Sequence, residues 1–409
     1  MNMAVRAKGL IAAVALLALS GAAGSALAGG FQLHEQSAEY QGMSFAGTAA
    51  GGMGLSSMFW NPATITQHSG WKDDINGTLV DPYSRARDET GGLGGVPDSG
   101  NIGKLAFIPA SYDSYQINEM FWIGMAMNSP FGMATRNSSI SRGALYGYKS
   151  KIFTFNVNPM VGVKLSDMIS LGFGLQVNYM KGNLSNAVGG TVIAKVKGND
   201  WGLGFTAGLT LTPTETTTIG IGYRSRIKHK LKGSYFGPGV SLGPASVDHT
   251  LPDQFTVSVR QQISPDFALL GTVEWTNWSL FKSFIIKRAG VPVGGNVYNW
   301  KDSWMFSVGG EYKYSDALVL RAGYAYERSP VPDATRGVRV PDNNRHWLSL
   351  GASYVANDWV TFHAGYSHLF VKKAPVNITA PAFTATYKSH VNIFSVSATV
   401  DPAKLFAAH

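Results

Sequence analysis

The chain has 409 residues, no cysteine, a formal charge of +9 and an aromatic content of 12%. The absence of cysteine excludes a disulfide framework and a cysteine metal site. Because the basic residues are spread along the chain, without a dense run interleaved with aromatics, we do not expect nucleic acid as a partner.

Residues 1–28 have the three parts of a secretory signal peptide. Arg6 and Lys8 form the basic start, residues 10–19 form the apolar centre, and Ala26-Leu27-Ala28 is a small-x-small cleavage site. Cleavage there would remove two basic residues and no acidic ones, which lowers the formal charge from +9 to +7. A retained membrane anchor is the alternative, but the apolar centre is short for a spanning helix.

The stretch from Gly29 to Ala63 is rich in Gly, Ala, Ser and Met and has neither a helical stripe nor strand alternation. A segment this apolar and irregular must be covered by other parts of the chain. We therefore predict that residues 29–68 form a hatch inside a β-barrel and line a passage for an apolar molecule.

Residues 69–400 read as a series of strands with period-two alternation, clearest in Trp304–Tyr314 and Leu318–Glu327. These segments exceed the five or six residues that are usual in soluble sheets and fit the roughly 9–11 that cross a bilayer. Aromatic residues recur near their ends, as in the girdles of membrane barrels. The candidate strands begin near Trp71, Ile102, Glu119, Lys151, Met168, Trp201, Glu215, Leu251, Asp266, Val297, Asp316, His346, Asp358 and Lys388.

Short turns such as Ser315-Asp316 alternate with long polar connections, which we place at Asn186–Asp200, Gly233–Thr250 and Pro330–Arg345. This alternation is the plan of outer-membrane barrels. The sequence therefore predicts an all-β fold: a membrane β-barrel of about 14 antiparallel strands, plugged by the small N-terminal hatch and followed by a tail at residues 401–409. Part of the basic excess would suit outer-membrane lipid and lipopolysaccharide or acidic substrates, and solvated loops would account for it equally well.

Two motifs could interrupt this plan. Asn61-Pro62-Ala63 ends the irregular segment, and Ser129-Pro130-Phe131-Gly132 ends the third candidate strand. Proline and glycine break a strand ladder, so the second motif could be a kink that opens a hole in the wall. An ordinary turn and an ordinary loop start are the alternatives for the two motifs.

Several stretches resemble the FadL family, the outer-membrane transporters for long-chain fatty acids and other hydrophobic compounds. The matching stretches are GFQLHEQSAEYQG with FWNPA, NSPFGMAT (128–135), YRSRIK (223–228), LPDQFTVS (251–258), WTNWSLF (275–281), WKDSW (300–304), YAYERSPVPDATR (324–336) and PDNNRHWLSLGASY (341–354). The resemblance covers essentially the whole chain after residue 28. It implies a monomeric fourteen-stranded barrel with a hatch, located in the outer membrane.

The resemblance also implies a mechanism of passive uptake. A hydrophobic ligand is captured among the loops and moves to a deeper apolar pocket, and the N-terminus, with Phe31 in the matching position, shifts to release it. The kink at Ser129, Pro130, Phe131 and Gly132 then opens the wall towards the hatch motif, and the ligand leaves sideways into the membrane. Lateral exit suits the physics, since each buried CH₂ group is worth about 0.8 kcal/mol.

One departure from the family concerns the ligand. Members that bind fatty acids place an arginine near the end of strand five, where this chain has Asn186. A buried carboxylate needs a cation or several donors, so Lys301, Arg260 or Arg345 would have to supply the charge. Otherwise the channel would prefer neutral aromatic or aliphatic hydrocarbons. Each of these basic residues could equally be a lumenal charge paired with Glu274, Glu311 or Asp302.

Two other classes of protein fit parts of the pattern. An aqueous porin for small polar solutes should show strongly charged lumen faces and no hatch, and a soluble exported β protein such as a lectin should have shorter strands. We find no nucleophile motif, P-loop or histidine spacing for a metal. We therefore expect no enzymatic activity, no cofactor and no metal.

Overall fold

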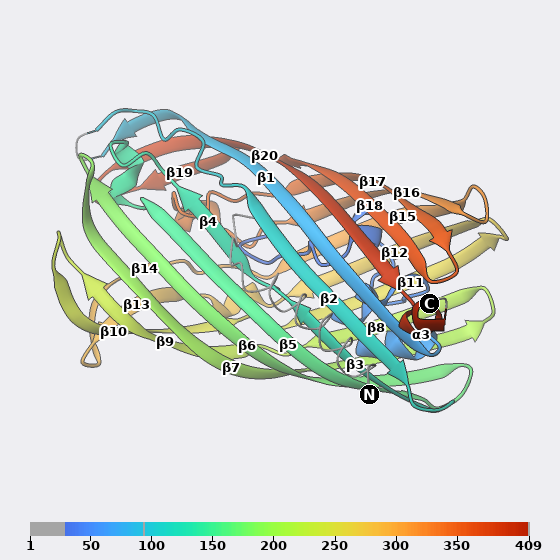
Figure 1. The fold of residues 1–409 in the computed structure, drawn as a ribbon. Coiled ribbons are helices and arrows are strands. Elements are labelled where there is room, and N and C mark those ends of the chain that lie inside the picture. Colours follow the sequence, from blue (N-terminus) through green and yellow to red (C-terminus); the bar gives the residue numbers. More distant parts are fainter. Residues whose placement is uncertain (1–28, 93–94, 408–409) are drawn as a thin grey trace.

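The computed structural model describes residues 29–92 and 95–407, so the predicted signal peptide lies outside the described residues. One antiparallel sheet closes on itself into a barrel around an irregular N-terminal segment (Figure 1). The first and last strands close it, with Gly77 of β1 opposite Val396 of β20. An even, closed barrel leaves no sheet edge unpaired in lipid.

The wall has fourteen strand positions, and at six of them a break divides the strand into two labelled pieces. The undivided positions are β1 (Trp71–Gly91), β2 (Ala106–Gln116), β5 (Lys149–Lys164), β6 (Ile169–Val188), β7 (Thr191–Thr214), β16 (Leu318–Arg328), β17 (Arg345–Asn357) and β20 (Phe383–Val400). The divided positions are β3 (Phe121–Asn128) with β4 (Gly132–Arg136), β8 (Thr217–Arg224) with β9 (Ile227–Phe236), β10 (Ser241–Leu251) with β11 (Gln254–Ser264), β12 (Phe267–Thr276) with β13 (Ser283–Arg288), β14 (Val291–Val297) with β15 (Ser303–Lys313), and β18 (Val360–Val371) with β19 (Ala374–Ile378).

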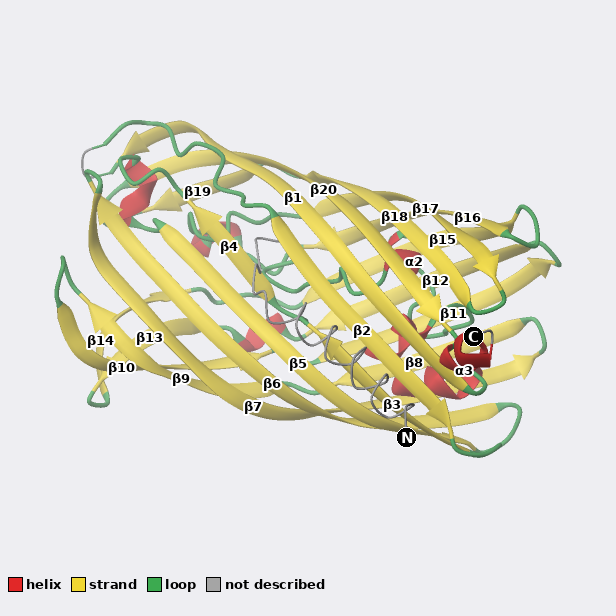
Figure 2. Ribbon diagram, in the orientation of Figure 1, coloured by secondary structure: helices red, strands yellow, loops and turns green. Residues whose placement is uncertain are grey.

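The predicted all-β barrel of fourteen strands is confirmed, but two of the predicted long connections are wrong. β6 continues to Val188 and β7 begins at Thr191, and β9 and β10 extend in the same way to Phe236 and from Ser241 (Figure 2). These extensions carry Lys, Thr, Ser and Asn where lipid-facing strands carry apolar residues. They therefore lack the apolar alternation of a membrane strand although their hydrogen-bond ladder continues.

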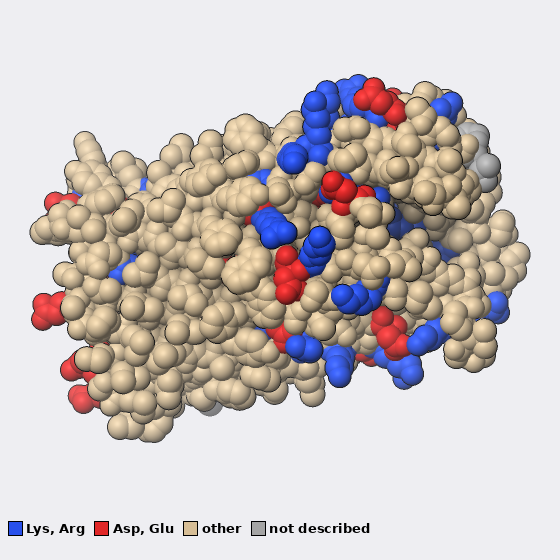
Figure 3. All heavy atoms as spheres, turned by 180° about the vertical axis from the view of Figure 1, so that it is seen from behind, with Lys and Arg blue, Asp and Glu red and all other residues tan. Residues whose placement is uncertain are grey.

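The outer face below these extensions is apolar. On β5 the outward side chains are Phe153, Phe155 and Val157, while Thr154 and Asn156 between them are buried. The rear face of the molecule has a broad band almost free of charge, and its charged residues gather mainly towards the end with the long loops (Figure 3). This is the band expected to face lipid hydrocarbon. In the described part of the chain, no helix is long and apolar enough to span a membrane.

The lumen is filled by residues 29–68, which we call the N-terminal segment. It contains the short helices α2 (Ala38–Gln41), η1 (Leu55–Phe59) and η2 (Pro62–Gln67). Wall glycines make room for its backbone: a Cβ atom at Gly220 would lie 1.8 Å from the carbonyl oxygen of Ala49, and one at Gly222 would lie 1.9 Å from that of Trp60. The wall and the N-terminal segment are therefore in direct backbone contact.

η3 (Arg142–Leu145) and η5 (Asp333–Thr335) lie in connections, η4 (Trp278–Leu280) lies at the break between β12 and β13, and α3 (Pro402–Ala407) follows the last strand. β20 ends at Val400, so the predicted tail begins as a helix and does not extend the strand. Phe406 of α3 packs beside Trp71, with ring centroids 6.3 Å apart.

Candidate functional site

The third strand position of the wall is broken at the predicted motif. β3 ends at Asn128 and β4 starts at Gly132. β3 pairs with both β2 and β5, whereas the ladder of β4 is with β5. On its other edge, one isolated bridge between Gly103 and Thr135 is described. The wall therefore lacks a continuous ladder beside the break.

The N-terminal segment covers this break. The Leu33 amide donates to the Pro130 carbonyl, and the Gly132 amide donates to the Phe31 carbonyl, both at 2.9 Å. The side-chain amide of Gln36 donates to the Ser129 carbonyl at 2.9 Å. Residues 31–33 thus serve as a short strand that replaces the missing ladder from inside the lumen.

The Phe31 side chain is only 2% exposed and lies in a cluster of aromatic rings. Its ring centroid is 4.7 Å from that of Trp278, 5.8 Å from that of Trp300 and 6.2 Å from that of Phe131. Beside Phe31 lies a cavity of about 30 Å³. Its lining is mainly apolar: Phe31, Met133, Ile152, Met180, Gly182, Leu184, Leu231, His249, Phe281, Phe284, Tyr298, Trp300, Arg339 and Val340.

Arg339 is the one lysine or arginine among the described residues that line this cavity. Its guanidinium donates to the Lys149 carbonyl at 3.0 Å, the Ser150 hydroxyl at 2.9 Å and the Ser185 carbonyl at 3.0 Å. It also donates to Oδ1 of Asn186 at 2.9 Å. All four acceptors are neutral, and Nε is buried without a hydrogen-bond partner among the described residues. Burial lowers the pKa of Arg339, which lies in the connection between β16 and β17.

The sequence-predicted cations lie elsewhere. The Lys301 side chain is exposed and is not part of the cavity lining. Arg260 forms a 2.8 Å ion pair with Glu311, the paired lumenal arrangement considered above. Arg345 pairs with Glu327 and Asp342. Asn186, by contrast, is next to the cavity through its bond to Arg339.

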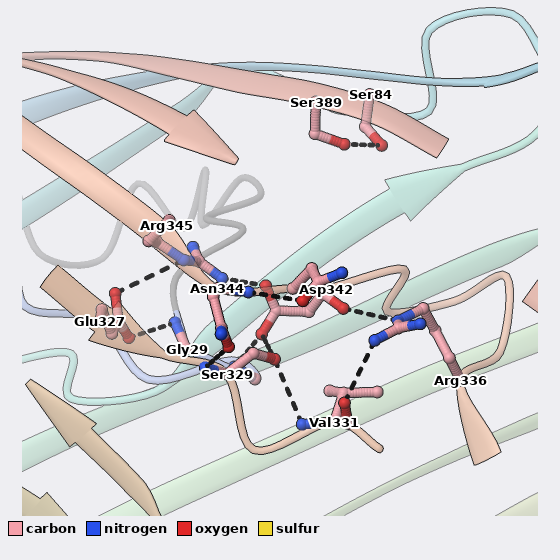
Figure 4. Close-up of polar contacts among 12 residues, drawn as sticks. Gly29, Ser84, Glu327, Ser329, Val331, Arg336, Asp342, Asn344, Arg345 and Ser389 are labelled. Carbon is pink, nitrogen blue, oxygen red and sulfur yellow. Dashed lines mark hydrogen bonds and ion pairs between the residues drawn. The ribbon is translucent and has the colours of Figure 1, made fainter. Parts of the chain in front are cut away.

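The two carboxylates that pair with Arg345 also hold the start of the N-terminal segment. The Gly29 amide donates to Glu327 at 2.8 Å, and the Gly30 amide donates to Asp342 at 3.0 Å. Arg345 lies between the two carboxylates (Figure 4). Displacing Phe31 from its cluster therefore means loosening a backbone that is anchored two residues earlier.

Asn61-Pro62-Ala63 lies against a different part of the wall. Asn61 Oδ1 accepts from the Ala63 amide at 3.0 Å, and its Nδ2 donates to the Leu209 carbonyl of β7 at 3.0 Å. A Cβ atom at Gly208 would lie 1.8 Å from Asn61 Oδ1. The residues that hydrogen-bond to the strand break are Phe31, Leu33 and Gln36, whereas the Asn61 motif fixes η2 against the inner face.

With the barrel, the filled lumen and the strand break described, the chain can be compared with known protein families. The profile of the outer membrane protein transport proteins (OMPP1/FadL/TodX) matches residues 19–401. The chain belongs to this family. It is therefore an outer-membrane β-barrel of a family that transports hydrophobic compounds.

Relatives and solved structures of the OMPP1/FadL/TodX family extend over the same length. The chain is 28% identical to the 47 kDa outer membrane protein of Pasteurella multocida, covering 93% of this chain and 96% of that one. It is 26% identical to the long-chain fatty acid transport protein of Escherichia coli K12, covering 89% and 92%. Its fold matches a FadL homologue of Pseudomonas aeruginosa with a TM-score of 0.86 at 24% identity, covering 91% and 99%. The toluene transporter TbuX of Ralstonia pickettii matches with a TM-score of 0.68 at 17% identity, covering 90% and 100%.

Sequence reasoning missed Arg339 and the role of the tryptophans around Phe31. Arg339 lies in the predicted Pro330–Arg345 connection, where nothing in the local pattern distinguishes a buried cation from a solvated one. Trp278 and Trp300 were available as a signal, because they belong to the WTNWSLF and WKDSW stretches that carry the family resemblance.

Proposed function

We propose that this chain is a passive channel for hydrophobic molecules that carry an anionic end, of the long-chain fatty acid class. The observation that supports this choice is the buried Arg339 guanidinium, which faces an apolar cavity and has only neutral hydrogen-bond partners among the described residues. A buried charge without compensation is costly, and a carboxylate would supply two acceptors in the geometry that guanidinium prefers.

The rest of the cavity suits an alkyl chain. Met133, Ile152, Met180 and Leu231 give it flexible apolar walls. A neutral hydrocarbon could use the same walls but would leave the arginine uncompensated. The name of the Escherichia coli relative, a long-chain fatty acid transport protein, supports the acid. Likeness to the toluene transporters extends to the fold alone.

The size of the cavity connects ligand binding to the strand break. Pockets for ligands of drug size measure ~300–1,000 Å³, whereas this cavity measures about 30 Å³ because Phe31 and its neighbours fill the space. A long-chain ligand would therefore displace Phe31. Since residues 31–33 form the strand that covers the break at Ser129–Gly132, the same displacement would uncover a lateral exit into the membrane. In this scheme Asn61, Pro62 and Ala63 hold the remainder of the N-terminal segment in place.

The choice of ligand is tested with purified protein in detergent and radiolabelled oleate and toluene. We expect oleate to bind the wild type with at least tenfold higher affinity than it binds Arg339→Gln. A charge-assisted hydrogen bond is worth about 1.5–3 kcal/mol. Toluene binding should change less than twofold, and the exposed control Lys301→Gln should behave as the wild type. Equal oleate binding by Arg339→Gln and the wild type would contradict the proposal.

The lateral exit is tested with a disulfide, because the chain has no cysteine of its own. Gln32 and Phe131 lie opposite each other in an antiparallel bridge. They are a non-hydrogen-bonded pair, because the hydrogen bonds join the residues on either side of them. Such pairs have the closest side chains in antiparallel sheets and suit a disulfide. The double variant Gln32→Cys/Phe131→Cys should lose oleate uptake in cells when oxidised and regain it when reduced. Equal uptake in both states, with cross-linking verified by mass, would exclude this exit.

A further inference from the structure

A patch of lysines lies on the outer face of the barrel at the end with the long loops. It occupies four neighbouring strand positions, β5, β6, β7 and β9, which lie side by side in the green part of the wall (Figure 1). We define the lysine patch by the outward residues Lys149, Lys151, Lys181, Lys195, Lys197 and Lys232.

Strand register arranges the lysine patch as a grid. Lys151 lies opposite Asn183, which lies opposite Lys197, and in the next row towards the membrane Lys181 lies opposite Asn199. Adjacent strands are about 4.8 Å apart, so lysines two strands apart are separated by about 10 Å. The grid thus alternates ammonium groups with amide donors, both of which bind phosphate oxygens.

The lysine patch lies directly above the lipid-facing band. Lys181 follows Tyr179 by two residues on β6, and Tyr179 packs beside Trp201 of β7 with ring centroids 5.1 Å apart. On β5, Lys151 is followed two residues later by Phe153 on the same face. Tyrosine and tryptophan gather at the membrane–water interface. The ammonium groups are therefore at the level of the lipid headgroups.

None of the six patch lysines forms an ion pair with a carboxylate of the described residues. The four strand positions contain one acidic residue, Asp200, and it accepts from the backbone amide of Lys230 at 2.9 Å. Other exposed cations of the loop end do have carboxylates: Arg85 pairs with Asp98, and Lys287 pairs with Asp248, each at 2.8 Å. On the rear face, acidic and basic side chains are interspersed (Figure 3).

We propose that the lysine patch binds the phosphate groups of lipopolysaccharide in the outer leaflet while the apolar band beneath it contacts the acyl chains. The long loops mark the extracellular end of an outer-membrane barrel, so this patch faces the leaflet that contains lipopolysaccharide. Anionic headgroups would supply counter-charges to lysines that form no ion pair among the described residues. The proposal is independent of the transported ligand, because the patch faces outward and the cavity faces the lumen.

The test compares two triple variants with the same change in charge. The patch variant is Lys151→Gln/Lys181→Gln/Lys197→Gln. The control, Lys282→Gln/Lys372→Gln/Lys373→Gln, changes exposed lysines outside the patch. Heat-dependent gel mobility verifies that both barrels are folded. Native mass spectrometry in detergent then measures binding of diphosphoryl lipid A, monophosphoryl lipid A and phosphatidylglycerol.

Each lysine near an anionic membrane surface adds to the binding free energy. The loss of three such contributions should weaken diphosphoryl lipid A binding by about 100-fold. The control should bind as the wild type, and the wild type should bind the diphosphoryl form at least tenfold more tightly than the monophosphoryl form. Equal binding by both variants would overturn the proposal. Phosphatidylglycerol bound as tightly as diphosphoryl lipid A would also overturn it, because the patch would then be a general anionic-lipid surface. Oleate binding by the patch variant should equal that of the wild type.

Discussion

The guanidinium of Arg339, which lines the apolar cavity beside Phe31, donates a 2.9 Å hydrogen bond to Oδ1 of Asn186. The family resemblance implies a cation near the end of strand five in members that bind fatty acids, where this chain has Asn186. In this chain the cation comes from a connection more than a hundred residues later and approaches the same strand end. In the proposed function, this arginine supplies the charge for the ligand carboxylate from a different part of the sequence.

Asn186→Asp should weaken oleate binding by about tenfold or more while leaving toluene binding within twofold. The new carboxylate would pair with Arg339 and compete with the ligand for its charge. Binding of both radiolabelled ligands in detergent measures the effect. Asn183→Asp, an outward-facing change on the same strand, is the matched control and should not alter oleate binding. Oleate binding by Asn186→Asp at the wild-type level would remove Arg339 from the ligand site.

Gln36→Met should make the N-terminal segment easier to displace. The Gln36 side chain donates to the Leu33 carbonyl at 3.1 Å and to the Ser129 carbonyl at 2.9 Å. Each bond contributes about 1 kcal/mol, so the loss of both should speed amide exchange at residues 31–33 by about 30-fold. Hydrogen–deuterium exchange with mass spectrometry measures this rate. Unchanged exchange would mean that the segment is held mainly by other contacts.

Gly208→Ala should destabilise the barrel, because the added methyl group would lie 1.8 Å from Asn61 Oδ1 and 2.8 Å from the Pro62 ring. Overpacking of this kind costs about 1–3 kcal/mol. Thermal unfolding in detergent should show a lower midpoint by several degrees. The control is Gly294→Ala, whose methyl group would meet nothing within 4 Å. Equal midpoints for the two variants would show that Asn61 moves aside without cost.

The wild-type protein should give no steady conductance in a planar lipid bilayer. The N-terminal segment lies in the lumen, and most of its described residues are buried there. A porin of similar strand number would conduct ions continuously. Steady ohmic channels from the wild type, absent from a blank detergent preparation, would favour the aqueous porin over the hydrophobic channel.

The features that could be predicted are those that a short stretch of sequence encodes. Period-two alternation located the membrane strands, and the Pro130–Gly132 stretch located the break, since proline and glycine disrupt a ladder wherever they occur. The two hairpin extensions, β6–β7 and β9–β10, were missed because their outward residues, such as Lys195 and Lys197, are polar and not apolar as on a lipid-facing strand. Arg339 was missed because its burial depends on long-range packing, which one sequence does not encode as a motif.

The N-terminal segment also constrains how the barrel is assembled. The Ala38 amide donates to Asn76 of β1 at 3.0 Å, and the Gln41 side chain donates to the Ile393 carbonyl of β20 at 3.1 Å. The two strands that meet at the seam are thus bridged from inside by residues synthesised before either of them. The N-terminal segment therefore holds the seam together from inside the lumen. Closure of the wall and docking of this segment should be a single cooperative event.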